Sequence, residues 1–274
     1  MELEFAKMHG AGNDFMVVRW PDGVDLPDEE VVRGWADRRR GVGFDQLLVL
    51  ETPERPGLAA FYRIFNSDGS EVEQCGNGVR CVARYLAGNE EGTTLMLGSP
   101  VGAVEARLLA GGEVTVNLGE PVYTPRALPF LTEVESDRYR LELNNAVVEF
   151  GAVSMGNPHV VIEVDSVDTA PVGILGPELQ GHASFPEGVN VGFMEVADPG
   201  RVRLRVLERG AGETRACGTG AAAAVAVARL WGLVGRDVRV ELTGGTLQVQ
   251  WQGPGHELWL SGPATRVFEG RIEL

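Results

Sequence analysis

Two cysteines of this chain stand in matching settings. Cys75 precedes Gly-Asn-Gly, and Cys217 precedes Gly-Thr-Gly. The residues that follow each glycine-rich turn are patterned as a helix, so we expect each thiol at a helix N-terminus. Unpaired N–H groups and the helix dipole favour anions there, which predicts a lowered thiol pKa and a place for a carboxylate. The glycines leave room for a ligand, at a helix-propensity cost of about 1 kcal/mol each.

Two thiols on opposite sides of one carbon suit the inversion of a stereocentre. One sulfur removes a proton as a thiolate, and the other delivers a proton as a thiol. Backbone N–H groups at the two helix starts would stabilise the negative charge that develops on a bound α-carboxylate. We expect no cofactor and no metal. Lys7 is the only lysine, which argues against a Walker-A loop and a pyridoxal phosphate Schiff base.

The surroundings of the two cysteines repeat along the chain with a period of 142 residues. In both halves a polar residue occurs at three similar distances before the cysteine, and the two halves differ in these distances by at most two residues. We call these positions the polar stations. The matched pairs are Asn66 with Glu208, Gln46 with Asn190, and Asn13 with Asn157. This regularity predicts an internal duplication of one supersecondary plan.

Each half is patterned as strands, then one helix, then a hairpin. Segments 202–208 and 237–242 have strand character, and the glycine pairs at 111–112 and 244–245 indicate hairpin turns. The helix after Cys217 is apolar on every face, as expected of a helix enclosed by a sheet. We predict an α+β fold of two pseudo-symmetric halves, each a mostly antiparallel or mixed sheet wrapped around a buried helix. The halves are residues 1–118, joined by a C-terminal strand 263–274, and residues 119–262.

The charge balance limits the partners of the protein. The chain has 24 basic and 39 acidic residues, a net charge of -15, which repels nucleic acid. No apolar run has the length of a signal peptide or a membrane span. Three cysteines without CxxC spacing indicate reduced thiols. We therefore expect a cytoplasmic protein with no nucleic-acid or membrane partner, and the sequence leaves a homodimer open without fixing the oligomeric state.

Five motifs together resemble those of the diaminopimelate epimerase family. They are KMHGAGNDF, FNSDGSEVEQCGNGVRC, GNPHVV, EGVNVGF and ERGAGETRACGTG, and they are spread over nearly the whole chain. The resemblance implies a small-molecule amino-acid substrate, diaminopimelate. It further implies interconversion of the LL and meso forms without pyridoxal phosphate, on the route to lysine and bacterial cell-wall peptide.

The resemblance also implies roles for individual residues. Cys75 and Cys217 would be the two bases, with His159 and Glu208 assisting near the reacting centre. Backbone N–H groups at the helix starts would hold the α-carboxylate, and the polar stations would line the pocket. The implied substrate-binding residues are Gly76, Asn77, Gly218 and Thr219 at the helix starts, and Asn13, Gln46, Asn66, Asn157, Asn190, Glu208 and Arg209 elsewhere.

Two alternatives share the paired cysteines. A two-cysteine racemase of proline or hydroxyproline would have the same fold and bases, but it would lack groups for a distal carboxylate and ammonium. Arg209 can pair bidentately with a carboxylate, which favours the diaminopimelate interpretation. The second alternative is a thiol redox sensor that joins Cys75 and Cys217 in a disulfide. Cys81 lies six residues into its helix and is expected in the core.

Overall fold

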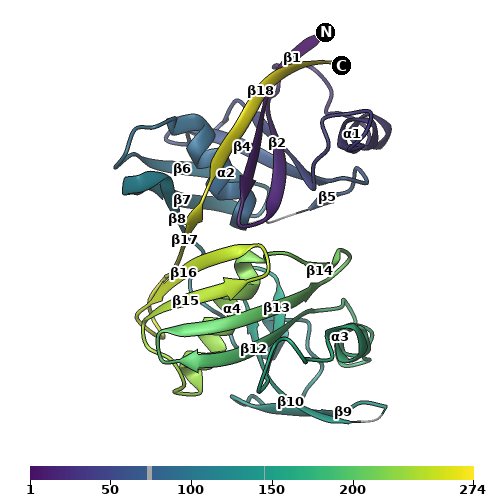
Figure 1. Cartoon of the computed structure of the whole chain (residues 1–274), viewed down its shortest axis with the longest axis vertical. Helices are drawn as coiled ribbons and strands as arrows, with labels where there is room; N and C mark the ends of the chain where they lie inside the picture. Colours follow the sequence, from purple (N-terminus) through teal and green to yellow (C-terminus); the bar gives the residue numbers. More distant parts are fainter. Residues whose placement is uncertain (73–75, 145) are drawn as a thin grey trace. The chain divides into compact units, whose positions relative to one another are not determined.

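The computed structural model describes residues 1–72, 76–144 and 146–274 (Figure 1). The chain divides into two compact units. Residues 1–117 together with 261–274 form unit 1, and residues 118–260 form unit 2. Among the helices of the described residues, none combines the length and apolar character that a transmembrane span requires.

Unit 1 is a mixed sheet that carries two helices. Its strands pair in the order β18–β1–β2–β3–β4–β6–β7–β8, with β5 beside β4; the β2–β3 and β4–β6 pairs are parallel and the others antiparallel. The elements are β1 (Glu2–Gly10), β2 (Asn13–Arg19), α1 (Glu29–Ala36), β3 (Gln46–Glu51), β4 (Ala60–Asn66), β5 (Glu71–Val72), α2 (Gly76–Ala87), β6 (Thr94–Ser99), β7 (Gly102–Leu108), η1 (Ala110–Gly112), β8 (Glu113–Asn117) and β18 (Thr265–Glu273).

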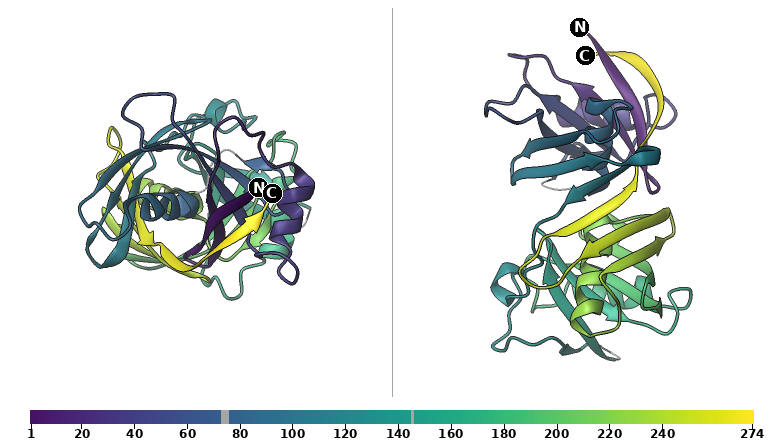
Figure 2. Two further views of the ribbon diagram at one scale, coloured as in Figure 1. Left: turned by 90° about the horizontal axis from the view of Figure 1, so that it is seen from above. Right: turned by 90° about the vertical axis from the view of Figure 1, so that its left-hand side faces the viewer.

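Helix α2 is the centre of unit 1. It contacts β1, β2, β3, β7, β8 and β18, and the view from above in Figure 2 shows it inside the curve of the sheet. Cys81 is fully buried on this helix, which confirms that it belongs to the core. The chain ends lie side by side, because the backbone N–H of Leu274 donates to the carbonyl of Met1.

Unit 2 repeats this plan. Its strands pair in the order β9–β10–β11–β12–β13–β15–β16, with β14 beside β13; the β11–β12 and β13–β15 pairs are parallel. The elements are η2 (Pro125–Ala127), β9 (Tyr139–Glu142), β10 (Val147–Ser154), β11 (Pro158–Glu163), α3 (Val172–Gln180), β12 (Asn190–Asp198), β13 (Arg201–Glu208), β14 (Gly212–Thr214), α4 (Gly218–Leu230), β15 (Asp237–Leu242), β16 (Gly245–Trp251) and the first half of β17 (Leu258–Pro263), of which the last three residues belong to unit 1.

Helix α4 is enclosed as its composition predicts. Every residue from Gly218 to Ala228 is buried, and the helix contacts β10, β11, β12, β13 and β16. Small side chains allow the sheet to approach closely. At Gly151 of β10, for example, an added Cβ would come within 2.5 Å of Val227 on α4.

The two units share one topology, which confirms the predicted fold of pseudo-symmetric halves. The sheet of unit 1 from β1 to β7 and the sheet of unit 2 from β10 to β16 have the same strand order and the same strand directions. Helix α1 of unit 1 and helix α3 of unit 2 occupy the same place in the order of elements. The register of the strands also brings the polar stations together. Gln46 pairs with Asn66 across β3 and β4, and Asn190 pairs with His159 across β12 and β11.

Candidate active site

The start of α4 holds the thiol of Cys217. Cys217 is the N-cap residue in an extended conformation, and its Sγ accepts from the backbone N–H of Gly220 at 3.4 Å. A Cβ at Gly220 would lie 3.2 Å from that sulfur, so any larger residue there would crowd the thiol. Within the described residues, the N–H groups of Gly218 and Thr219 make no hydrogen bond. These two donors are therefore available to an anion.

A carboxylate also faces this thiol. Cys217 donates to Oε2 of Glu208 at 3.0 Å, while the hydroxyl of Thr214 donates to Oε1 of the same carboxylate. Burial and the negative charge of Glu208 raise the pKa of Cys217 well above its usual value, although the Thr219 hydroxyl and the Gly220 N–H oppose this shift. The expectation of a lowered thiol pKa is thus wrong for Cys217, because desolvation and a like charge outweigh the helix N-terminus.

Asn157 and His159 form a second group beside the start of α4. The side-chain amide of Asn157 donates to the Thr219 hydroxyl at 3.4 Å, and its Oδ1 lies 3.0 Å from Nε2 of His159. His159 is 1% exposed, and burial, followed by the charge of Arg209, lowers the pKa of its imidazole to about 3. The ring is therefore neutral, with the Nε2 proton directed to Asn157 and Nδ1 left as an acceptor.

Asn190 and Arg209 are held together at the ends of β12 and β13. Oδ1 of Asn190 accepts from the backbone N–H of Arg209 at 2.9 Å, and the guanidinium of Arg209 donates to the carbonyl of Glu187 at 2.9 Å. Gly188 has a positive φ of 70°, and a Cβ there would lie 3.2 Å from the Arg209 side chain. In the part of the chain that the structure describes, Arg209 forms no ion pair, so its guanidinium is available to an anionic ligand.

The start of α2 in unit 1 has its own polar pair. The side-chain amide of Asn77 donates to Oδ1 of Asn13 at 2.7 Å. This contact matches the Asn157–Thr219 contact of unit 2, with the direction of donation reversed. Gly76 and Asn77 are buried in the first turn of α2. Cys75, the predicted first base, lies outside the described residues.

Gln46 and Asn66 complete the candidate residues of unit 1. Nε2 of Gln46 donates to Oδ1 of Asn66 at 3.0 Å, and Asn66 donates in turn to the Ser70 hydroxyl. Oε1 of Gln46 is buried without a hydrogen-bond partner among the described residues. A buried acceptor of this kind is costly unless a ligand satisfies it, which suits an ammonium donor.

Two residues of these networks were missed by the sequence argument. Thr214 donates to Glu208, and its position three residues before Cys217 was the available signal. Arg80, to which the sequence assigned no role, is fully buried, and it donates to Oδ1 of Asn77 at 2.6 Å. The absence of an arginine at the equivalent position of α4 could have drawn attention to it.

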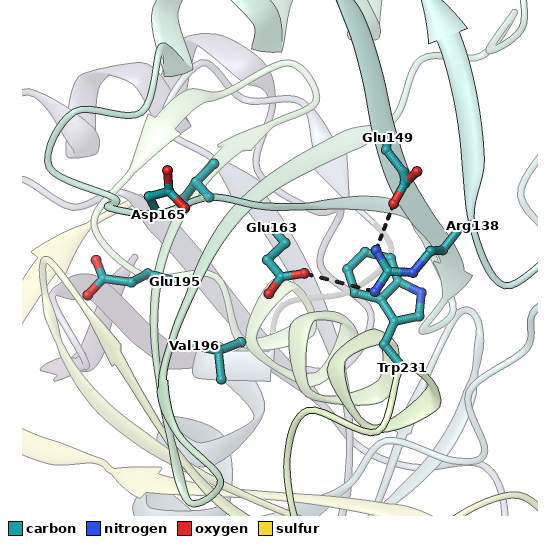
Figure 3. A pocket seen from close by; sticks show the side chains of 8 residues that line it. Arg138, Glu149, Glu163, Asp165, Glu195, Val196 and Trp231 are labelled. Carbon is teal, nitrogen blue, oxygen red and sulfur yellow. Dashed lines mark hydrogen bonds and ion pairs between the residues drawn. The ribbon is translucent and has the colours of Figure 1, made fainter.

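A separate cavity in unit 2 contains none of the candidate residues. It measures about 420 Å³, and four of the eight residues that line it are acidic (Figure 3). Arg138 fills one side of it: its guanidinium lies 3.9 Å from the centroid of the Trp231 ring and pairs with Glu149 at 2.7 Å and with Glu163 at 4.0 Å. Within residues 1–72, 76–144 and 146–274, no group of acidic, histidine or cysteine side chains is arranged to hold a metal ion.

Comparison with known proteins identifies the family. A family model described as diaminopimelate epimerase matches residues 5–124 and 151–267. The chain belongs to the diaminopimelate epimerase family. A diaminopimelate epimerase of Ectopseudomonas mendocina (strain ymp) is 49% identical over 276 residues, and one of Pseudomonas aeruginosa (strain UCBPP-PA14) is 47% identical; each match covers 100% of both chains. Membership of this epimerase family makes the protein an amino-acid isomerase.

Solved structures with lower identity share the fold of the epimerase family. A hydroxyproline epimerase from Agrobacterium vitis aligns with a TM-score of 0.70 at 18% identity, covering 99% of this chain and 92% of that one. A probable proline racemase from Agrobacterium radiobacter K84 aligns with a TM-score of 0.70 at 15% identity, covering 99% and 93%. At these identities the likeness concerns the architecture.

Proposed function

We propose that the protein interconverts LL- and meso-diaminopimelate with two cysteines as acid and base, without pyridoxal phosphate. The full-length relatives at 47–49% identity support this reaction by their names. The observation that carries the chemistry is the Cys217 thiol, whose sulfur lies at the start of α4 beside unpaired N–H donors and 3.0 Å from a carboxylate oxygen. A role in lysine and peptidoglycan precursor synthesis, in the cytoplasm, belongs to the same proposal.

The raised pKa of Cys217 supports a division of roles between the two sulfurs. Cys217 begins the cycle as the thiol, and Cys75 begins it as the thiolate. In the LL-to-meso direction, the bond from the α-carbon to its hydrogen breaks as an S–H bond forms on Cys75. The S–H bond of Cys217 then breaks as a new bond from hydrogen to carbon forms on the opposite face. The Cys217 thiolate that results is stabilised by the hydroxyl of Thr219 and the N–H of Gly220.

The charge that develops on the substrate requires donors at its α-carboxylate. In this proposal the carboxylate accepts from the N–H groups of Gly218 and Thr219 and from those of Gly76 and Asn77. Such donors are already oriented before the reaction, so they stabilise the enolate-like transition state without reorganisation. The Asn77–Asn13 and Asn157–Thr219 hydrogen bonds lie at matching places in the two units. They support the same role in carboxylate binding for the starts of α2 and α4.

Recognition of the distal end of the substrate is assigned to the remaining polar residues. Arg209, which forms no ion pair among the described residues, binds the distal carboxylate. The neutral amides of Gln46, Asn66 and Asn190 direct the ammonium and carboxylate groups without adding net charge. An amino acid that lacks the distal groups leaves these residues unpaired in the site, which is a basis for strong rejection.

A substrate panel tests the proposal. Purified protein is incubated with LL-diaminopimelate, L-proline and trans-4-hydroxy-L-proline, and the stereoisomers are separated on a chiral column. Conversion of LL- to meso-diaminopimelate, at a kcat/KM at least about 10³-fold above that for either imino acid, is the expected result. Turnover of proline without turnover of diaminopimelate would establish the racemase alternative. Inactivity on all three, with a Cys75–Cys217 disulfide forming under mild oxidation, would favour the redox sensor.

A further inference from the structure

Arg80 is a buried cation one turn into α2. Its side chain is fully buried, and its guanidinium donates to Oδ1 of Asn77 at 2.6 Å, to the carbonyl of Gly76 at 3.3 Å and to the carbonyl of Pro263 at 3.5 Å. A helical side chain projects back toward the helix N-terminus, so the charge lies against the first turn of α2. In sequence, that turn immediately follows Cys75.

Gly10 of β1 packs beside this guanidinium and beside the carbonyl groups around it. A Cβ at Gly10 of β1 would lie 3.5 Å from Nη2 of Arg80, 3.6 Å from the carbonyl oxygen of Asn77 and 3.0 Å from that of Pro263. Asn77, held by Arg80 through its Oδ1, directs its amide N–H to Asn13 at 2.7 Å. One cation therefore orients two residues that the proposed function assigns to the substrate.

The duplicated half lacks this cation. The residue 142 positions after Arg80 is Ala222, which is buried in α4, and the residue matched with Asn66 of unit 1 is Glu208 of unit 2. The first turn of α2 thus has an added positive charge, whereas the first turn of α4 has an added negative charge. Two helix starts of the same architecture are electrostatically opposite.

We propose that Arg80 is a positioning residue that orients Asn77 and Asn13 for the substrate and supplies a positive charge that keeps the thiol of Cys75, five residues earlier in the sequence, reactive. This inference rests on the proposed function for the identity of the substrate. It adds that two residues make the surroundings of the two cysteines different. Unit 1 has Arg80 where unit 2 has Ala222, and unit 2 has Glu208 where unit 1 has Asn66. An arginine remains charged at every relevant pH, so its effect is permanent.

The test compares Arg80→Met and Arg80→Lys with the wild type and with Arg84→Met as a matched control. Arg84 lies one turn further along α2, and its guanidinium donates to Asn89. Two quantities are measured at pH 7. The first is the rate of alkylation of Cys75 by iodoacetamide, followed by peptide mass spectrometry. The second is the pair of constants KM and kcat for LL-diaminopimelate, with circular dichroism as the check of folding.

For Arg80→Met we expect alkylation of Cys75 to slow about tenfold and KM to rise about tenfold, because one pKa unit or one charged hydrogen bond corresponds to roughly that factor. Arg80→Lys keeps the charge but loses the planar fork, so its alkylation rate should stay within about threefold of the wild type while KM still rises about tenfold. Arg84→Met should change neither quantity by more than about twofold, as is usual for a residue outside the networks.

A folded Arg80→Met variant with the alkylation rate and KM of the wild type would overturn the proposal. If Arg80→Met does not fold, Arg80→Lys decides: a wild-type KM would overturn the proposal, and a raised KM with preserved alkylation would support it. The alkylation measurement needs no turnover. A wild-type protein that is inactive on diaminopimelate would therefore refute the proposed function while the role of Arg80 is still decided by the alkylation rates.

Discussion

The sulfur of Cys217 lies 3.0 Å from Oε2 of Glu208, with the thiol as donor. A carboxylate in this position opposes ionisation of the thiol, and burial acts in the same direction. The sulfur is consequently kept protonated at a helix start that would otherwise favour a thiolate. This arrangement gives one of the two proposed catalytic cysteines the protonation state of an acid.

Replacing Glu208 by glutamine should make Cys217 more acidic. The variant keeps a side chain of the same shape but removes the negative charge that raises the pKa of the thiol. We expect alkylation of Cys217 near neutral pH to accelerate about tenfold for each unit by which the pKa of its thiol falls. We also expect kcat to fall at least about 10²-fold. Glu213→Gln serves as the control, because Glu213 pairs with Arg205 on the surface. An alkylation rate equal to that of the wild type would contradict the assigned effect of Glu208.

Removal of either sulfur should abolish epimerisation without unfolding the protein. In Cys217→Ala the substrate loses the acid on one face, and in Cys75→Ala it loses the base on the other. We expect kcat to fall at least about 10³-fold in each variant, with a circular dichroism spectrum like that of the wild type. Cys81→Ala is the matched control, and it should retain activity because Cys81 belongs to the core of unit 1. Full activity in either of the first two variants would refute a two-base mechanism.

The internal duplication was predictable because equivalent residues have the same spacing along the sequence in both halves. Asn13 and Asn157, and Gln46 and Asn190, lie at equivalent places in the two units because each pair stands at the same end of equivalent strands. The enclosure of α4 was predictable from its uniformly apolar surface. The pKa of Cys217 was not predictable, because it depends on burial and on a carboxylate contact that only the folded strand β13 provides. The burial of Arg80 was not predictable, because arginine is rarely buried and periodicity does not reveal the carbonyl groups to which its guanidinium donates.

His159 should remain neutral over the whole working range of the enzyme. Burial and the nearby charge of Arg209 lower the pKa of His159 to about 3, whereas the unfolded chain has a value near 6.5. The contribution of the buried, neutral imidazole to the free energy of unfolding is therefore complete above pH 6.5, and it declines as the pH falls toward 3. We expect nitrogen NMR of labelled protein to report the Nε2–H tautomer and no titration between pH 5 and pH 8. A titration midpoint near 6.5 would contradict the buried, neutral assignment.

Asp14 should support the fold at neutral pH and lose that role in acid. Although burial opposes ionisation, hydrogen bonds from Arg38 and Lys7 hold the pKa of Asp14 below its usual value of 3.8. Its contribution is present above that value and declines as the pH falls below it. Asp14→Asn leaves Lys7 without its charged partner, so we expect a loss of about 3 kcal/mol in the free energy of unfolding at pH 7.

Urea unfolding of the wild type and of Asp14→Asn between pH 7 and pH 3 measures this effect. The difference between the two proteins should begin to narrow as the pH falls below about 3.8, because the Asp14 carboxyl of the unfolded wild type becomes protonated while that of the folded protein stays ionised. Asp68→Asn is a control of the same chemistry, since Asp68 is exposed and the hydrogen bonds of its carboxylate are local, from Ser70. A difference that stays constant from pH 7 to pH 3 would contradict the ionic role of Asp14.

Isotope incorporation tests the central claim most directly. LL-diaminopimelate is incubated with the enzyme in deuterium oxide, and the meso product is analysed by mass spectrometry and NMR at early conversion. The account predicts a single deuteron at the α-carbon that was inverted, because the hydrogen removed by Cys75 is not the one delivered by Cys217, and no conversion with Cys217→Ala. Inversion with retention of the original hydrogen at that carbon would mean that one group serves both faces, and it would contradict the two-cysteine mechanism.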